Sequence, residues 1–240
     1  MQRTQREHDQ IRPLTFQRGY TDNPGGSVLV RWGATYVLCT AMIEEGVPTF
    51  LKDSGSGWLT AEYSMLPGST PTRRTRDVAR GRPDGRSSEI QRLIGRSLRA
   101  GADLSLLPGR TLYVDCDVLQ ADGGTRTASI NGAWLAAHDA VSRALESGAL
   151  ASSPLLTKVA AVSVGIVEGM PVLDLEARED QAAEVDMNIV MTGEGEYIEV
   201  QGSAEKGTFS PAMLERLLDL AREGIRQVTL AQARSLESPE

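Results

Sequence analysis

The order of the predicted elements constrains the fold more than any other feature of this sequence. Apolar runs and period-two alternation predict strands at residues 27–32, 35–43, 111–120, 159–167, 172–175, 185–191 and 197–201. An alanine-rich helix follows the third strand and ends near Glu146, and an amphipathic helix over 210–234 follows the last. Two strand-rich halves, at about 12–150 and 155–235, each end in a long helix. This order predicts one α+β domain over residues 1–240, built as a pseudo-repeat.

Bulk composition excludes several classes of protein. With 40% hydrophobic and 24% charged residues, the chain has the composition of a globular domain. No apolar run approaches the roughly 20 residues that cross a bilayer, so no membrane partner is expected. The segment Met1–Asp9 is polar and does not resemble a signal peptide. Cys39 and Cys116 are the only cysteines and there is no CxxC pair, so we expect a reducing cytoplasm rather than a zinc site or a disulfide framework.

The charge distribution indicates a nucleic-acid partner, although the net charge of −7 alone argues against one. Residues 73–99 contain nine arginines against three acidic residues. These arginines are Arg73, Arg74, Arg76, Arg80, Arg82, Arg86, Arg92, Arg96 and Arg99. Guanidinium groups bind phosphate oxygens bidentately, and the chain has only three lysines. The segment is either a solvated face with a mobile loop over 67–86 or an electrostatic guide for an RNA backbone, and the density of arginines favours the guide.

A helix is predicted directly after this loop. Ser88 and Gln91 have the spacing of a capping box, and the apolar residues from Ile90 to Leu98 form one stripe. The last three arginines of the segment fall on another face of this helix. Aromatic residues are scarce nearby, so readout of base sequence is not expected.

The segment Gly123-Gly124-Thr125-Arg126-Thr127 lies between a predicted strand and a predicted helix. Two glycines let the backbone approach an anion, and the amides and dipole at a helix start attract it. The two threonines add hydroxyl donors and Arg126 adds a guanidinium. The segment is either an anion site or an ordinary strand-to-helix turn with a threonine cap, and the motif alone does not decide between them.

Three aspartates, Asp174, Asp180 and Asp186, surround a predicted short helix or turn over 179–184. Spaced carboxylates suit an octahedral Mg²⁺ ion, and one with a raised pKa could protonate a leaving oxygen. The alternative is a solvated acidic loop, which the spacing alone favours. Asp186 is the strongest candidate, because it lies between Val185 and Met187, where a charge requires a reason.

Four blocks of sequence resemble the ribonuclease PH family, whose bacterial members are phosphorolytic 3′ exoribonucleases. These blocks are Trp58–Pro67, Glu89–Arg99, Asp115–Thr127 and Val185–Asn188. The resemblance extends from about Arg12 to Leu230. It implies a two-layer, pseudo-duplicated fold like domain 2 of ribosomal protein S5, with helices packed on mixed β-sheets. It also implies a homohexameric ring, a trimer of dimers, in which the arginine-rich loop contributes to subunit contacts.

The resemblance also assigns roles to individual residues. Arg86, Gly124, Thr125 and Arg126 match the family's phosphate site. Asp180 and Asp186 match its catalytic and metal-binding carboxylates, for Mg²⁺ or Mn²⁺. The arginines matching RNA-binding positions, or lying on the adjacent helix, are Arg73, Arg74, Arg76, Arg80, Arg92, Arg96 and Arg99. Gly68, Pro71 and Lys206 depart from the family pattern, in which a basic residue, a histidine and a glycine are usual.

The resemblance, together with these residues, implies an enzyme that trims the 3′ ends of precursor tRNA and other RNAs with inorganic phosphate. The products are nucleoside 5′-diphosphates, and the reaction is close to reversible, so nucleotide addition is expected with excess diphosphate. The main alternative is a non-catalytic RNA-binding ring subunit of the same fold, which usually lacks part of the phosphate and carboxylate set. A hydrolytic nuclease, which releases monophosphates, leaves the anion site without a role.

Overall fold

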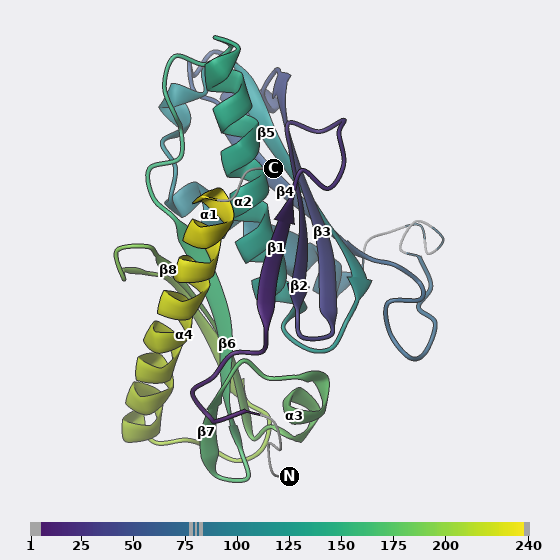
Figure 1. Cartoon of the computed structure of the whole chain (residues 1–240), viewed down its shortest axis with the longest axis vertical. Coiled ribbons are helices and arrows are strands. Elements are labelled where there is room, and N and C mark those ends of the chain that lie inside the picture. Colours follow the sequence, from purple (N-terminus) through teal and green to yellow (C-terminus); the bar gives the residue numbers. More distant parts are fainter. Residues whose placement is uncertain (1–5, 77–78, 80, 82–83, 238–240) are drawn as a thin grey trace.

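The computed structural model describes residues 6–76, 79, 81 and 84–237. Two sheets form its framework (Figure 1). The first has the order β1-β2-β3-β5-β4, and its strands are β1 (Leu14–Arg18), β2 (Gly26–Trp32), β3 (Thr35–Glu45), β4 (Trp58–Met65) and β5 (Arg110–Gln120). The second has the order β7-β6-β8-β9, and its strands are β6 (Val159–Val167), β7 (Met170–Leu173), β8 (Val185–Thr192) and β9 (Tyr197–Ala204).

The first sheet is mixed because of one connection. All its neighbouring strands are antiparallel except β4 and β5, which are parallel. Parallel neighbours need a crossover, and α1 (Gly85–Ala100) supplies it. The chain therefore leaves β4 through the arginine-rich loop and enters α1 at the end of the sheet where β5 also ends. The second sheet is antiparallel throughout.

Helix α2 (Thr125–Glu146) lies between the two sheets (Figure 1). It contacts β2, β3 and β5 on one side and β6 on the other. This position explains its alanine-rich sequence, since 15 of its 22 residues are buried and small side chains allow close approach. A Cβ atom at Gly132 would lie 2.3 Å from a methyl carbon of Val30. The side chain of Asn131 exchanges two hydrogen bonds with the backbone of Ala161, at 2.9 and 2.7 Å, and so attaches α2 to β6.

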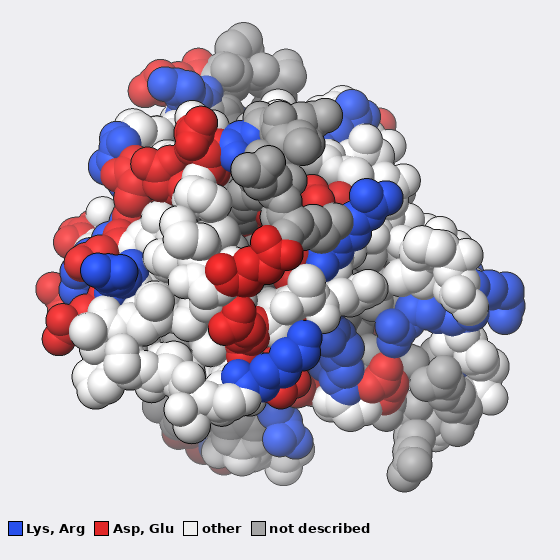
Figure 2. Space-filling view, turned by 90° about the horizontal axis from the view of Figure 1, so that it is seen from below, with Lys and Arg blue, Asp and Glu red and all other residues white. Residues whose placement is uncertain are grey.

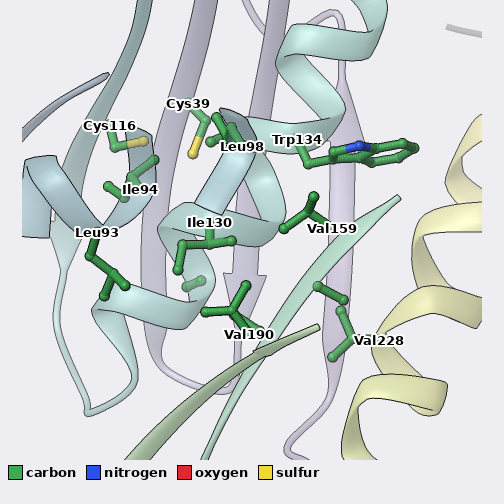
Figure 3. Close-up of a cluster of buried hydrophobic side chains, with 14 of the residues drawn as sticks. Cys39, Leu93, Ile94, Leu98, Cys116, Ile130, Trp134, Val159, Val190 and Val228 are labelled. Carbon is green, nitrogen blue, oxygen red and sulfur yellow. The ribbon is translucent and has the colours of Figure 1, made fainter. Parts of the chain in front are cut away.

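The core is continuous across both halves (Figure 3). Helix α1 packs on β4, and α4 (Pro211–Glu237) packs on β6, β7 and β1. Cys39 and Cys116 are register partners on β3 and β5, and both are buried free thiols. The alternation along β5 places Val114, Cys116 and Val118 in this core, as period two requires. No helix among the described residues has the length and apolar composition needed to span a bilayer.

The predicted α+β class, with helices packed on sheets, is confirmed, and most strands lie within a few residues of their predicted ranges. The predicted start of α1 is wrong: the helix begins at Gly85, and Asp84 caps it by accepting a hydrogen bond from the Arg86 amide at 2.6 Å. Aspartate is a strong N-cap residue, so Asp84 was the better signal than Ser88. The chain also forms β1 and β4, which the pattern analysis did not include. That the two halves form a pseudo-repeat within one domain stays a prediction.

Candidate active site

A cavity of about 660 Å³ opens where the two halves meet. Its walls come from the starts of α1 and α2, from α3 (Ala177–Ala182) and from β8. The predicted phosphate and carboxylate residues all line it, namely Arg86, Gly124, Thr125, Arg126, Asp180 and Asp186. Segments far apart in the sequence are therefore brought to one place, with cationic groups from the first half facing carboxylates from the second.

The glycine segment after β5 forms the tight turn that was predicted. Gly123 and Gly124 have φ values of +75° and +66°, which residues with a Cβ atom rarely adopt. A Cβ atom at Gly123 would also lie 2.5 Å from the carbonyl oxygen of Leu175, so the two halves touch here. Gly124 is the N-cap of α2, and the start of this long helix therefore faces the cavity with its positive end.

The two threonines of this segment have different roles. The Tyr63 hydroxyl donates to Thr125 Oγ1 at 2.9 Å, which leaves the Thr125 proton available for an acceptor in the cavity. Burial raises the pKa of Tyr63, which therefore remains a donor. Thr127 Oγ1 donates to the Gly124 carbonyl at 2.9 Å. Thr127 does not line the cavity, and its hydroxyl proton is used in this hydrogen bond, so the suggestion that it donates to an anion is wrong.

Arg126 is held at the cavity by residues that pattern analysis did not identify. Its Nη2 atom donates to Glu89 Oε2 at 2.8 Å, and Gln201 Nε2 donates to Glu89 Oε1 at 3.1 Å. Burial alone would raise the pKa of Glu89, but the hydrogen bonds from Arg126 and Gln201 lower it, so the carboxylate stays charged. Arg126 Nε is buried and has no hydrogen-bond partner among the described residues. Buried donors are normally satisfied, so an anion accepting from Nε fits this site.

The carboxylates of the second half lie on α3 and β8. Burial and, to a smaller extent, the charge of Asp180 raise the pKa of Asp186 to about 6, although Arg126 and Arg86 oppose the shift. A carboxyl group in this range can hold a proton near neutral pH and release it to a developing alkoxide. The apolar sequence neighbours of Asp186 predicted that its charge would be functionally important. The structure gives the physical reason, because burial makes the charged form costly.

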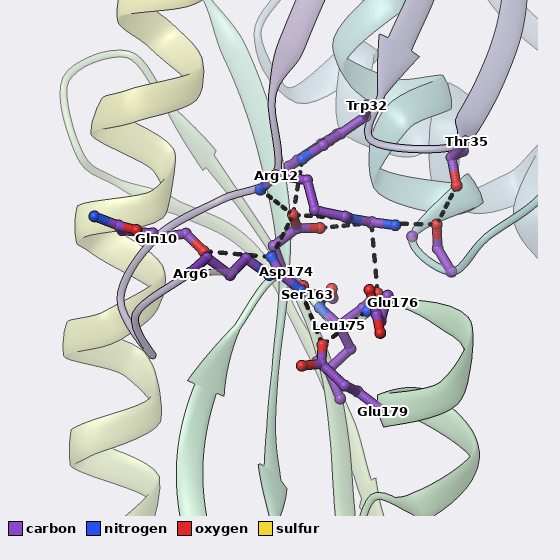
Figure 4. A network of polar contacts seen from close by, with 12 residues as sticks. Arg6, Gln10, Arg12, Trp32, Thr35, Ser163, Asp174, Leu175, Glu176 and Glu179 are labelled. Atoms are coloured by element: carbon purple, nitrogen blue, oxygen red, sulfur yellow. Dashed lines mark hydrogen bonds and ion pairs between the residues drawn. The ribbon is translucent and has the colours of Figure 1, made fainter. Parts of the chain in front are cut away.

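The third aspartate of the predicted acidic group has a different place. Asp174 is 1% exposed, does not line the cavity and accepts hydrogen bonds from Arg12 and Trp32 (Figure 4). The prediction that Asp174 could be one of three aspartate ligands of a Mg²⁺ ion is therefore wrong. The sequence pattern could not reveal this arrangement, because Arg12 and Asp174 are 162 residues apart in the chain.

The described residues include no group of three or more histidine, cysteine, aspartate or glutamate side chains arranged to hold a metal ion. Asp180 and Asp186 line the cavity as a pair, and the charge of Asp180 contributes to the raised pKa of Asp186. Such a pair fits an ion that keeps several waters and takes its other ligands from phosphate oxygens, as Mg²⁺ does.

The predicted RNA-binding arginines divide into two sets. Arg74 lines the cavity and pairs with Asp84 at 3.1 Å, while Arg73 and Arg76 are exposed beside it, and Arg80 lies outside the described residues. The arginines of α1 form the second set, in which two side chains already have partners within the chain. Arg96 pairs with Glu199 at 2.6 Å, and the Arg99 guanidinium lies 4.5 Å from the centre of the Trp58 ring. Seen from the lower end of the molecule, basic side chains extend from the centre of the face towards its right, and acidic ones gather mainly at its left (Figure 2).

A second cavity of about 730 Å³ continues from the first towards β9. The two share Arg86, Arg126, Asp180 and Asp186, and the second adds Gln201 and Lys206. Asn188, 8% exposed, lines both. Two of the three departures from the family pattern therefore lie at the site, since Pro71 lines the first cavity and Lys206 the second. The third, Gly68, lines neither cavity.

The fold and this cavity define an α+β protein in which arginine and hydroxyl donors face a pair of carboxylates. Comparison with known families gives the class: the models for domains 1 and 2 of the 3′ exoribonuclease family match residues 10–142 and 157–224. The chain belongs to this family.

Solved structures share the fold at low sequence identity. Rice (Oryza sativa) Rrp46 has a TM-score of 0.78 at 19% identity, over 96% of this chain and 98% of that one. A chain of the Archaeoglobus fulgidus exosome with RNA bound to the active site has a TM-score of 0.79 at 21% identity, over 94% and 90%. A chain of an archaeal exosome core has 0.78 at 20% identity, over 95% and 89%. At these identities the likeness establishes the fold.

Proposed function

We propose that this chain is a bacterial-type ribonuclease PH, a phosphorolytic 3′ exoribonuclease that trims precursor tRNA and other RNA 3′ ends. One observation supports this above the others. Arg86, Thr125 and Arg126 line the same cavity as Asp180 and Asp186, and burial raises the pKa of Asp186 to about 6. The arrangement offers cationic and hydroxyl donors to an attacking anion and a proton donor to a leaving oxygen.

In the proposed reaction, an oxygen of inorganic phosphate attacks the phosphorus of the last phosphodiester. The bond from that phosphorus to the 3′ oxygen of the preceding nucleotide breaks, and a nucleoside 5′-diphosphate leaves. The shortened RNA takes a proton on its 3′ oxygen, which Asp186 supplies. The reaction exchanges one phosphorus–oxygen linkage for another, so excess diphosphate drives nucleotide addition.

Each residue has a defined task in this scheme. Arg86 and Arg126 hold the phosphate, the Thr125 hydroxyl donates to it, and the start of α2 adds its dipole. Asp180, together with Asp186 once it has given up its proton, would hold Mg²⁺ or Mn²⁺, and the ion would supply charge neutralisation at the phosphorus oxygens. Arg73, Arg74, Arg76 and Arg80 guide the RNA backbone. We further propose a homohexamer, a trimer of dimers, working in the cytoplasm.

The second candidate is a non-catalytic RNA-binding subunit of a ring with this fold. The similarity to exosome chains, Rrp46 among them, fits this candidate at least as well as the enzyme. The site favours the enzyme, because no member of the predicted phosphate and carboxylate set is replaced and all of its members line one cavity.

The deciding experiment is incubation of the purified chain with a 3′-extended tRNA and Mg²⁺, with and without inorganic phosphate. Nucleoside diphosphates released only with phosphate support phosphorolysis. Monophosphates released without phosphate identify a hydrolase, and tight RNA binding without release identifies the non-catalytic subunit. Light scattering on the same sample tests the hexamer, which requires the mass of six 25.8-kDa chains.

A further inference from the structure

A buried ionic network lies behind the cavity and joins the N-terminal segment to the second half (Figure 4). At its centre is Asp174, directly after β7, with a φ of +56°. Its carboxylate accepts from the Arg12 backbone amide at 2.7 Å, from Arg12 Nη2 at 2.7 Å and from the Trp32 indole at 2.9 Å. A non-glycine residue in this backbone region costs free energy, so the surrounding contacts must hold it there.

The other edge of the Arg12 guanidinium reaches the glycine segment. Nη1 donates to the carbonyl oxygen of Asp122 and Nη2 to that of Gly123. Thr35 holds the same two residues, because its hydroxyl donates to the Gly123 carbonyl at 2.7 Å and accepts from the Asp122 amide at 2.9 Å. The turn that begins α2 is thus held by two side chains that do not themselves line the cavity.

The same network extends to the carboxylate side of the site. Arg6 Nη1 donates to Asp174 Oδ2 at 3.0 Å, and Arg6 Nη2 donates to Glu179 Oε2 at 2.9 Å. Glu179 Oε2 also accepts from the Glu176 amide at 3.0 Å, completing the capping box of α3. Asp180 is the next residue, and α3 has only six residues, so this cap determines where Asp180 lies.

Stability alone is a weak reason for such a network. Desolvation of a buried ion pair offsets most of its attraction, and apolar replacements are often neutral or better. The chain provides a comparison: Arg18, which is partly buried, pairs with the buried Asp139 at 2.7 Å, and its hydrogen bonds within the described residues go to Asp139 and the Ser235 carbonyl, neither of which lines the cavity. The Arg12–Asp174 pair differs because its hydrogen bonds end on the backbone of the phosphate turn.

We propose that Arg12 and Asp174 are positioning residues that hold the glycine turn and α3 in one geometry. They fix the phosphate donors of the first half relative to the carboxylates of the second. This inference rests on the proposed function for its kinetic readout, but not for its structural one.

The test compares Arg12→Lys with the control Arg18→Lys. Both changes keep a positive charge beside a buried aspartate, but they replace the guanidinium group of the arginine, with its several donors, by a single ammonium group. Arg12→Lys should raise the apparent KM for inorganic phosphate by at least about tenfold, because small misplacements of an anion are costly. RNA affinity should stay unchanged, and Arg18→Lys should leave the phosphate KM at the wild-type value. Equal phosphate KM values in the two variants overturn the inference.

A second pair of variants avoids disturbing the ion pair. Thr35→Val removes both hydrogen bonds to the turn, and Thr111→Val removes one equally buried hydroxyl, which donates to Gly46 at 2.7 Å. Only Thr35→Val should raise the phosphate KM. If both valine variants behave like wild type, Thr35 does not hold the turn as argued and the inference fails.

Amide hydrogen exchange keeps the inference testable without activity. Arg12→Lys and Thr35→Val should accelerate exchange in the peptide spanning 121–128, and the two controls should not. If the wild type releases no diphosphate, the proposed function fails, while faster exchange in that peptide still supports the positioning role. Exchange equal to that of the controls overturns the positioning role whatever the activity.

Discussion

Glu89 and Arg126 form an ion pair that links the beginnings of α1 and α2, with Arg126 Nη2 2.8 Å from Glu89 Oε2. The pair is partly exposed, with side chains 37% and 19% accessible, so its contribution to stability is at most about 1 kcal/mol. Its importance is instead geometric, since it fixes a guanidinium at the cavity while leaving Arg126 Nε buried and available.

The first prediction concerns this pair. Glu89→Ala should raise the apparent KM for phosphate by about tenfold, because Arg126 loses its fixed orientation. Glu89→Gln should have a smaller effect, since the amide oxygen can still accept from Arg126. Initial rates across a phosphate series measure both. A lower phosphate KM in both variants would show that the negative charge of Glu89 repels phosphate more than its geometry helps.

The sequence predicted the parts of the site that depend on local chemistry. The glycine turn and the start of α2 follow from backbone requirements within five residues. Asp186 was identified by its apolar neighbours, and its desolvation is the property that raises its pKa to about 6. The strand alternation of β5 placed its core residues in the same way.

The remainder depends on contacts that no local pattern contains. Asp174 and Asp180 look alike in sequence, yet one is buried against Arg12 and the other lines the cavity. The roles of Glu89 and Gln201 arise only because α1 and β9 lie beside each other. The start of α1 was misplaced for a different reason, since a capping-box spacing was preferred over a strong single cap at Asp84.

The second prediction separates Arg86 from the other arginines of α1. Arg86→Ala should raise the phosphate KM more than it weakens RNA binding, because Arg86 lines the cavity beside Arg126. Arg96→Ala is the matched control, since Arg96 lies on the same helix, is 55% exposed and pairs with Glu199. Phosphate titration and RNA filter binding on each variant provide the comparison. Weaker RNA binding with an unchanged phosphate KM in Arg86→Ala would remove Arg86 from the phosphate site.

The third prediction concerns RNA affinity. A double change of Arg73 and Arg76 to alanine should weaken RNA binding, and should reduce the slope of log K against log salt by about 0.7 for each lost phosphate contact. Arg99→Ala should affect stability instead, because Arg99 stacks on Trp58 and donates to the Leu59 carbonyl at 2.9 Å. Binding isotherms at several salt concentrations measure the slopes. A larger salt effect in Arg99→Ala than in the double variant would move the RNA path to α1.

The fourth prediction follows from the pKa of Asp186. Asp186→Asn should bind RNA without turnover, because the substituted amide is neither a proton donor of the required acidity nor a charged metal ligand. It should also change stability with pH. The folded-state pKa of about 6 lies above the ordinary value of 3.8, so the native state binds the proton more tightly than the unfolded chain. Stability from this group is therefore present at low pH and is lost as pH rises from about 4 through about 6.

Asp186→Asn removes that loss. In EDTA at pH 7.5 the variant should be more stable than the wild type by about 1–3 kcal/mol, a few degrees in Tm for a chain of this size. Well below pH 4 the two proteins should melt together, since Asp186 is then neutral in both the folded and the unfolded chain. Asp219→Asn is the control, because Asp219 is 71% exposed and should show no such pH dependence. A Tm difference for Asp186→Asn that is equal at pH 4 and pH 7.5 would contradict the burial argument, because a desolvated carboxylate destabilises the fold only when it is charged.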